Sequence, residues 1–150
     1  MNVADALRGI RRLGLDASPI IYFVERHPVF GAIAAAIFYE IERTTLTGVA
    51  SALTYTKTLT KPIALRDLVL VRSYRRLLSQ APGILCPVLG RETAERAAFL
   101  RAAYGLKTPD ALHIAAAITA GCDAFLTNDV ALKRVTLEIP VIVISELTLL

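Results

Sequence analysis

The strongest constraint on the fold of this chain is a regular alternation of short apolar segments with longer helix-forming segments. Such alternation favours a parallel sheet with helices on both of its faces. The predicted fold class is therefore α/β, a three-layer α/β/α sandwich around a central, mainly parallel sheet. We expect strands at LGLD (13–16), LTGVAS (46–51), GILCPVL (83–89), AFLTND (124–129) and PVIVIS (140–145). The continuous β-branched run in the last of these is typical of a strand buried on both faces.

Helices are predicted between these strands from apolar periodicity and from residues that favour helix ends. Ser18 and Thr108 are candidate N-caps, because each is followed by a proline at the first helical position. Pro62 is expected to end the helix that contains it. The predicted helices are SPIIYFVER (18–26), VFGAIAAAIFYEIER (29–43), SALTYTKTLTKP (51–62), LRDLVLVRSYRRLLSQ (65–80), GRETAERAAFLRAAYGL (90–106) and TPDALHIAAAITAG (108–121).

Length and composition predict a single domain over residues 1–150, since 150 residues with 55% hydrophobic content suffice for one core but not comfortably for two. No apolar stretch is long enough for a membrane span or has the form of a signal peptide, so we expect a cytoplasmic protein without membrane association. Cys86 and Cys122 are isolated thiols in apolar surroundings and are interpreted as core residues. The net charge of +4 mildly favours a polyanionic partner.

Three aspartates stand where functional groups gather in parallel sheets, at or near the carboxyl ends of strands. Asp16 closes the first strand, Asp129 follows the fourth, and Asp110 lies in the first turn of a helix. Clustered carboxylates repel one another and are stabilised by a hard divalent cation. Mg²⁺, with Mn²⁺ as its substitute, suits oxygen ligands and favours hydrolysis of a phosphodiester. His27 and His113 are well separated, which argues against Zn²⁺.

Several segments, taken in order, resemble the PIN domain family, and within it the VapC-like toxins of toxin–antitoxin pairs. The resemblance is carried by LDASPIIYFVE (15–25), SALTYTKTLTKP (51–62), YGLKTPDALHIAAAITAGCDAFLTND (104–129) and the closing strand. It implies a Mg²⁺-dependent ribonuclease with an RNA substrate, usually a homodimer, that is held inactive by a cognate antitoxin protein. By position, it also assigns site residues: Asp16, Asp110 and Asp129 as metal-binding and catalytic acids, Asp123 as a further acid near the metal, and Ser18 and Thr127 as accessory polar residues.

Lys57 departs from the pattern of that family, because the resemblance places a glutamate at this position. An ammonium group there would pair with the aspartates and compete with Mg²⁺. We therefore expect the nuclease activity to be weakened or absent in this chain, whether the lysine is native or an inactivating substitution. Glu40 and Glu42 on the preceding helix could replace the missing ligand, and surface charge at a helix end is the plainer interpretation of Lys57.

Two alternatives to an active nuclease stay open. A phosphoacceptor receiver domain also combines acids, a threonine and a lysine at one sheet edge, but its lysine follows the last strand, whereas Lys57 comes early. A non-catalytic PIN-like module that binds RNA or an antitoxin agrees well with Lys57.

The apolar content of residues 20–41 and 51–59 predicts burial against a second copy of the chain. The large apolar residues concerned are Ile20, Tyr22, Phe23, Phe30, Ile37 and Phe38.

Overall fold

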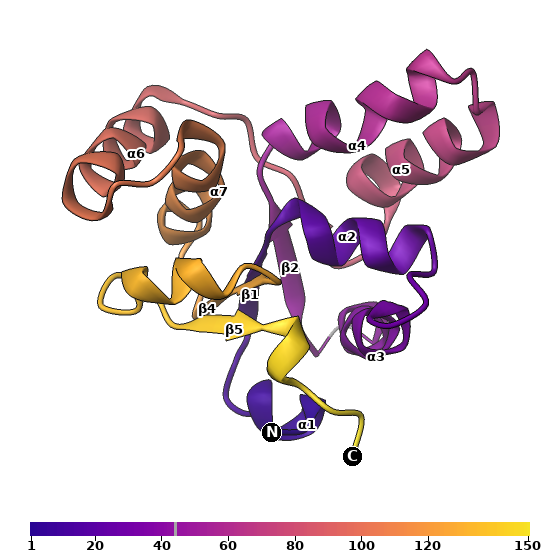
Figure 1. The fold of residues 1–150 in the computed structure, drawn as a ribbon, viewed down its shortest axis with the longest axis horizontal. Coiled ribbons are helices and arrows are strands. Elements are labelled where there is room, and N and C mark those ends of the chain that lie inside the picture. The colour runs from indigo at the N-terminus through magenta and orange to yellow at the C-terminus, as the bar shows by residue number, and fades with distance from the viewer. Residues whose placement is uncertain (44) are drawn as a thin grey trace.

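The computed structural model describes residues 1–43 and 45–150, which form a parallel sheet covered by helices on both faces (Figure 1). The strands are β1 (Arg12–Leu15), β2 (Thr47–Ala50), β3 (Ile84–Leu85), β4 (Ala124–Thr127) and β5 (Val141–Val143). Their order in the sheet is β3-β2-β1-β4-β5, and every neighbouring pair is parallel. The predicted α/β class is confirmed, and the mainly parallel sheet is parallel throughout.

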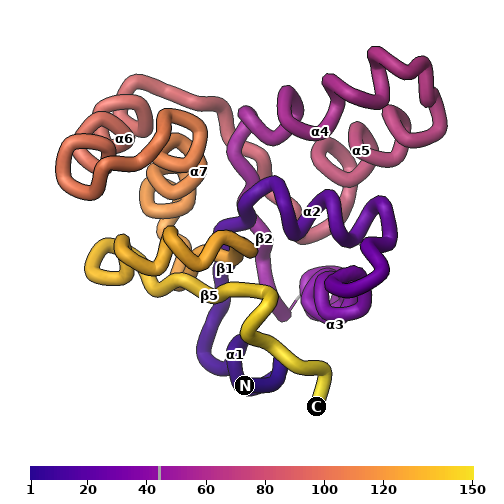
Figure 2. The backbone as a smooth tube through the Cα atoms, viewed as in Figure 1, coloured from indigo at the N-terminus to yellow at the C-terminus, as the bar shows by residue number. Residues whose placement is uncertain are grey.

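The helices alternate with the strands as the sequence predicts. They are α2 (Ala17–Val24), α3 (Gly31–Glu42), α4 (Leu53–Ala64), α5 (Leu68–Gln80), α6 (Arg91–Tyr104) and α7 (Thr108–Thr119). Three short elements were not predicted: α1 (Val3–Ala6) and the 3₁₀ helices η1 (Val130–Val135) and η2 (Ile144–Glu146). They are too short to produce a periodic apolar pattern. The two chain ends lie at the same side of the molecule (Figure 2), where Thr148 donates its backbone N–H to the carbonyl of Met1.

Two apolar cores, one on each face of the sheet, make this a three-layer structure. Leu13 and Leu15 of β1 point into the core that contains α2 and α3, whereas Phe125 of β4 points into the core that contains α6 and α7. Gly14 lies between the two leucines and faces α7, where an added Cβ would stand 2.5 Å from the Cβ of Ala117. This close approach of strand and helix is possible only because residue 14 has no side chain.

The strand order brings together two segments that are far apart in the sequence. β1 lies between β2 and β4. The chain places β2 and β3 on one side of β1, and then crosses over to place β4 and β5 on its other side. Ligands of open parallel sheets bind at the carboxyl end of the strands beside such a crossover. Asp16 directly follows β1, and Thr127 ends β4. The topology therefore places these two residues at the position where a site is expected.

Several predicted boundaries need correction. The N-cap of α2 is Asp16 rather than Ser18, and that of α7 is Lys107 rather than Thr108. Helix α4 continues through Pro62 and ends at Ala64, two residues later than predicted. The predicted strand at 83–89 has only two residues in the sheet. Each error arises because several neighbouring residues fit the same local signal.

The closing strand was predicted to be buried on both faces, and the structure shows packing on both faces without full burial. β5 is an edge strand that pairs only with β4, and Val141 and Ile142 are only half-buried. Ile142 packs against the core beside α2 and α3, and Val141 packs against the core beside α6 and α7. The strand order that leaves β5 at the edge is not encoded in its own residues.

The apolar residues that suggested a second copy are largely covered within the chain itself. Ile20, Ile37 and Phe38 are buried in the core beside β1. Among the exposed apolar side chains, four lie close together in sequence around the turn between α4 and α5, namely Ile63, Leu65, Leu68 and Val69. Association with a second copy stays a prediction. Among the described residues, no helix is both long enough and apolar enough to cross a bilayer.

Candidate active site

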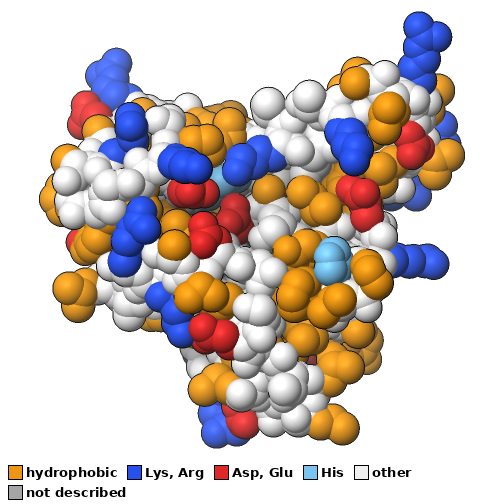
Figure 3. Space-filling model, viewed as in Figure 1, with side chains coloured by type: hydrophobic (Ala, Val, Ile, Leu, Met, Phe, Trp, Pro, Cys, Tyr) orange, Lys and Arg blue, Asp and Glu red, His pale blue; other side chains and the backbone are white. Residues whose placement is uncertain are grey.

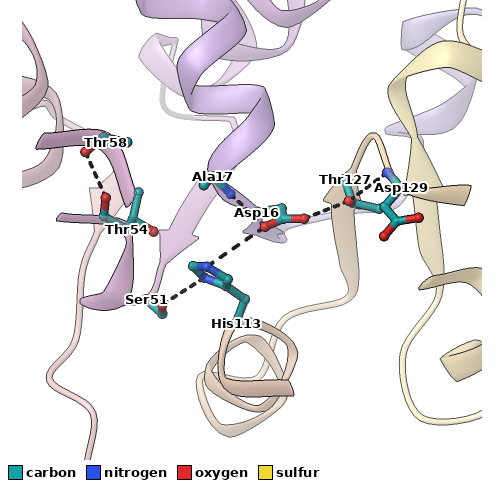
Figure 4. Close-up of polar contacts among 8 residues, drawn as sticks. All are labelled: Asp16, Ala17, Ser51, Thr54, Thr58, His113, Thr127 and Asp129. Carbon is teal, nitrogen blue, oxygen red and sulfur yellow. Dashed lines mark hydrogen bonds and ion pairs between the residues drawn. The ribbon is translucent and has the colours of Figure 1, made fainter. Parts of the chain in front are cut away.

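Asp16 is the central acid of the site, because its carboxylate links the start of α2 to the end of β4 (Figure 4). Its Oδ1 accepts the backbone N–H of Ala17 at 2.8 Å, and its Oδ2 accepts the hydroxyl of Thr127 at 2.8 Å. Only 8% of Asp16 is exposed. A buried carboxylate at a helix N-terminus is stabilised by such donors and by the helix dipole. Asp16 is therefore held in one orientation.

Thr127 and Asp129 form the second part of the site. The Thr127 hydroxyl, which donates to Asp16, accepts the backbone N–H of Asp129 at 3.1 Å. The Asp129 carboxylate is exposed and accepts the N–H of Ala131 at 3.0 Å, which caps the 3₁₀ helix η1. The loop after β4 thus connects a buried acid to an exposed one through a single hydroxyl.

Asp110 completes the group of three predicted acids. It lies in the first turn of α7 and is half-buried. Burial raises the pKa of its carboxyl above the ordinary value, and the negative charges of Asp16 and Asp129 raise this pKa further. Lys57 acts in the opposite direction and lowers the pKa of Asp110. Asp110 therefore lies within electrostatic range of Asp16, Asp129 and Lys57.

Lys57 of α4 lies in the same pocket as two of the acids. This pocket has a volume of about 530 Å³, and its lining includes Asp16, Asp129 and Lys57. Figure 3 shows acidic side chains at the centre of this face with Lys and Arg side chains beside them. The expected hydrogen-bonded pairing is absent, since among residues 1–43 and 45–150 no ion pair joins Lys57 to an acid. Its charge acts on the acids over a longer distance.

A buried histidine lies below the acids. The Nδ1 of His113 is 2.9 Å from the Ser51 hydroxyl, and its Nε2 is 4.0 Å from Oδ1 of Asp16 (Figure 4). Burial lowers the pKa of His113 below its ordinary value, and Lys57 lowers it further, although Asp16 opposes both effects. Burial of the ring therefore favours its neutral form over the protonated form. Nε2 has no hydrogen-bond partner among the described residues.

The other predicted site residues are divided between this pocket and the rest of the molecule. Ser18 lines the pocket beside Asp16. Asp123 lies at the opposite, amino end of the strands, where its Oδ2 accepts the backbone N–H groups of Arg11 and Arg12 at 2.9 Å each. The prediction of Asp123 as a metal-site acid placed it at the wrong end of β4, because it precedes that strand.

Sequence reasoning missed three polar residues of this region. Tyr22 and Asn128 line the pocket and are joined by a hydrogen bond of 3.0 Å from Asn128 Nδ2 to Tyr22 Oη. Ser51, interpreted only as a helix start, is the partner of His113. Ser51 follows β2 and Asn128 follows β4, so the end of each strand was the available signal.

We tested whether these side chains fit the Mg²⁺ that the family resemblance implies. In the described part of the chain, no three His, Cys, Asp or Glu side chains converge on one point as metal ligands do. Each oxygen of Asp16 already accepts one hydrogen bond, and Lys57 lines the same pocket with a positive charge. Glu40 does not replace the missing ligand, because it lines a different cavity with Leu149. The residues as arranged do not fit a Mg²⁺ site.

Comparisons with known proteins agree with this fold. A family model described as the PIN domain matches residues 14–138. No curated protein matches the chain. VapBC2 from Rickettsia felis, solved with a DNA fragment from its promoter, has a TM-score of 0.71 and 13% identity, covering 87% of this chain and 97% of that one. A toxin–antitoxin complex from Klebsiella pneumoniae has a TM-score of 0.63 and 20% identity, covering 89% and 97%.

Proposed function

The chain belongs to the PIN domain family, and from that premise we propose that it is an endoribonuclease toxin of a toxin–antitoxin system whose Mg²⁺-dependent activity is weakened or lost through Lys57. PIN domains are typically nucleases, and the nuclease role is supported by Asp16 directly after β1 and Asp129 after β4. The observation that carries the proposal is the shared pocket of Lys57, Asp16 and Asp129.

The charge balance of the pocket explains why a lysine would oppose metal binding. A divalent cation is stabilised by the combined negative charge of several carboxylates. Lys57 supplies a positive charge that lowers the pKa of Asp110, so it already stabilises the ionised form of that acid. A lysine in place of the glutamate expected from the family pattern removes an oxygen ligand and adds repulsion toward the incoming cation. Both effects act against Mg²⁺.

The experiment that tests this proposal compares the unaltered chain with Lys57→Glu. Binding of Mn²⁺ is measured calorimetrically, and cleavage of a mixed pool of single-stranded RNA is followed by gel electrophoresis. We expect weak Mn²⁺ binding and slow cleavage in the unaltered chain, and at least a tenfold gain in both for Lys57→Glu, which restores the ligand charge. Lys61→Glu is the matched control, because it changes the same charge one turn further along α4.

Three results would contradict the proposal. If the unaltered chain cuts RNA as fast as Lys57→Glu, Lys57 does not limit activity. If Lys57→Glu cleaves RNA but Asp129→Asn in that background cuts equally well, the acids are not the reacting site. If neither protein cuts RNA but both bind it, the second candidate function is favoured, a non-catalytic PIN module that binds RNA or an antitoxin. Lys57 supports that candidate, because its positive charge opposes the binding of Mg²⁺.

An antitoxin protein is the proposed partner, since both of these structures are described as toxin–antitoxin assemblies.

A homodimer is proposed as well. Sedimentation of the purified chain at micromolar concentration measures this, and a monomer alone would contradict the dimer. Leu68 is an exposed apolar residue of the turn between α4 and α5. Leu68→Ser should therefore weaken self-association if this turn is the interface.

A further inference from the structure

Two neutral residues of the site pocket have no part in the acid and lysine chemistry described above. Tyr22 of α2 and Asn128, which follows β4, line the same pocket as Asp16, Lys57 and Asp129. Tyr22 comes six residues after Asp16, so at 1.5 Å per helical residue it stands about 9 Å further along α2. The pocket therefore has a charged part and, beyond it, a part with an aromatic ring and an amide.

The ring of Tyr22 is fixed by contacts on several sides. Its Oη accepts Asn128 Nδ2 at 3.0 Å, and its ring centroid lies 4.6 Å from that of His27 and 5.3 Å from that of Phe30. His27 is itself held, because its Nδ1 accepts the backbone N–H groups of Val29 and Phe30 at 3.1 Å each. A ring that is already ordered loses little conformational entropy when a ligand packs on it.

The amide of Asn128 is also fixed in orientation. Its Oδ1 accepts the backbone N–H of Ser145 at 2.9 Å, which settles which end of the amide is oxygen, and its Nδ2 donates to Tyr22. One proton of Nδ2 and the hydroxyl proton of Tyr22 have no acceptor among residues 1–43 and 45–150. A polar pair with two free donors beside an ordered ring matches the needs of an unpaired nucleobase, which stacks on aromatic rings and offers acceptors at its edge.

We propose that Tyr22 and Asn128 form a nucleobase-binding subsite, in which an unpaired RNA base stacks on the Tyr22 ring and accepts hydrogen bonds from the free donors. This inference rests on the RNA substrate of the proposed function and assigns residues that select or position it. The two carboxylates of Asp16 and Asp129 outnumber the one ammonium of Lys57 in the pocket and repel RNA phosphates. Uncharged contacts with a base therefore contribute a large share of the affinity at this site.

The experiment uses the unaltered chain, without added divalent cation, and short single-stranded RNAs that carry a terminal dye and one 2-aminopurine at successive positions. Anisotropy of the dye measures RNA binding, and quenching of 2-aminopurine fluorescence measures stacking. Tyr22→Phe keeps the ring, and Tyr22→Leu keeps apolar volume without it. Tyr39→Ala is the matched control, since Tyr39 is an exposed tyrosine of α3 that lines a different cavity. Circular dichroism confirms that each variant is folded.

We expect one position of the RNA to be quenched by the unaltered chain and by Tyr22→Phe, but not by Tyr22→Leu. Loss of the ring should weaken binding at least about 5-fold, as loss of a base–aromatic stack does. Tyr39→Ala should bind like the unaltered chain. If folded Tyr22→Leu binds RNA as tightly as the unaltered chain, with the same quenching, the subsite is refuted and the proposed function is untouched. If the unaltered chain binds no RNA, the subsite is refuted, and the proposed function is decided separately by RNA cleavage in Lys57→Glu.

Discussion

The hydroxyl of Thr127 donates to the buried carboxylate of Asp16 at 2.8 Å and so joins residues that are 111 positions apart in the sequence. The same oxygen accepts the N–H of Asp129. Removal of this hydroxyl would leave one oxygen of a buried carboxylate without its donor, which is more costly than the loss of an exposed hydrogen bond. The relationship makes Thr127 a support of the acid geometry rather than a surface residue.

Thr127→Val should therefore destabilise the protein by about 1–3 kcal/mol, because it has nearly the same shape but no hydroxyl. The free energy of unfolding is measured by urea titration at neutral pH. Thr127→Ser is the control, since it keeps the donor and loses only a methyl group. Equal stability of the Val and Ser variants would show that the hydrogen bond to Asp16 contributes little.

Removal of the Lys57 charge should raise the pKa of Asp110 further above its ordinary value. Burial and the charges of Asp16 and Asp129 already raise this pKa, and Lys57 is a cation that lowers it. We expect a carbon-13 NMR titration of the Asp110 carboxyl to move to higher pH in Lys57→Met. Because Lys57 is exposed, the difference should shrink as salt is added.

Lys61→Met is the matched control for this titration. Lys61 is an exposed cation on the same helix, one turn beyond Lys57, and does not line the pocket. The Asp110 titration should be almost unchanged in this variant. Equal shifts in the two variants would mean that Asp110 responds to overall charge and not to a lysine in its own pocket.

The three acids at the carboxyl edge could be predicted because each lies beside a strand or helix end that the sequence marks clearly. Asp16 and Asp129 follow apolar strands, and Asp110 follows Thr108 and Pro109 at a helix start. Asp123 carries a similar signal, but it precedes β4 and therefore lies at the other end of the sheet. An acid in a turn is easily recognised from the sequence. The end of the sheet at which it lies depends on whether it precedes or follows its strand.

The contacts that depend on strand order could not be predicted from the sequence. Tyr22 and Asn128 are 106 residues apart, and their hydrogen bond forms only because β4 pairs with β1. Strand order also leaves β5 at the sheet edge, although its own residues suggest a buried strand. Local periodicity encodes which face of a strand is apolar but carries no information about which strand lies beside it.

Asp123 should support stability in a pH-dependent way and should have no part in metal binding. The backbone N–H groups of Arg12 and Arg11 lower the pKa of its carboxyl. A carboxyl with a lowered folded-state pKa stabilises the protein above its unfolded pKa of about 3.9, and this contribution is lost as the pH falls through the folded value. Asp123→Asn removes the charge and so removes this pH dependence.

We expect Asp123→Asn to be less stable than the unaltered chain at pH 6, with the difference shrinking as the pH falls below about 4. Urea titrations at pH 6, 5, 4 and 3 measure it. In the Lys57→Glu background, Asp123→Asn should leave Mn²⁺ binding unchanged. A large loss of Mn²⁺ affinity would return Asp123 to the metal site from which its contacts with Arg11 and Arg12 exclude it.

The hydrogen bond between Tyr74 and Glu25 should stabilise the attachment of α5 to the rest of the molecule. Tyr74 of α5 is fully buried, and its hydroxyl donates to the carboxylate of Glu25 at the end of α2. Tyr74→Phe keeps the ring and removes this donor, so we expect a loss of about 1–3 kcal/mol in the free energy of unfolding.

Tyr104→Phe is the matched control, because the Tyr104 hydroxyl makes the same kind of bond to Glu138 at the surface, at 2.9 Å. Water replaces a lost partner there, so the control should cost less than about 1 kcal/mol. Equal losses in the two variants would show that burial of Tyr74 adds nothing to its hydrogen bond.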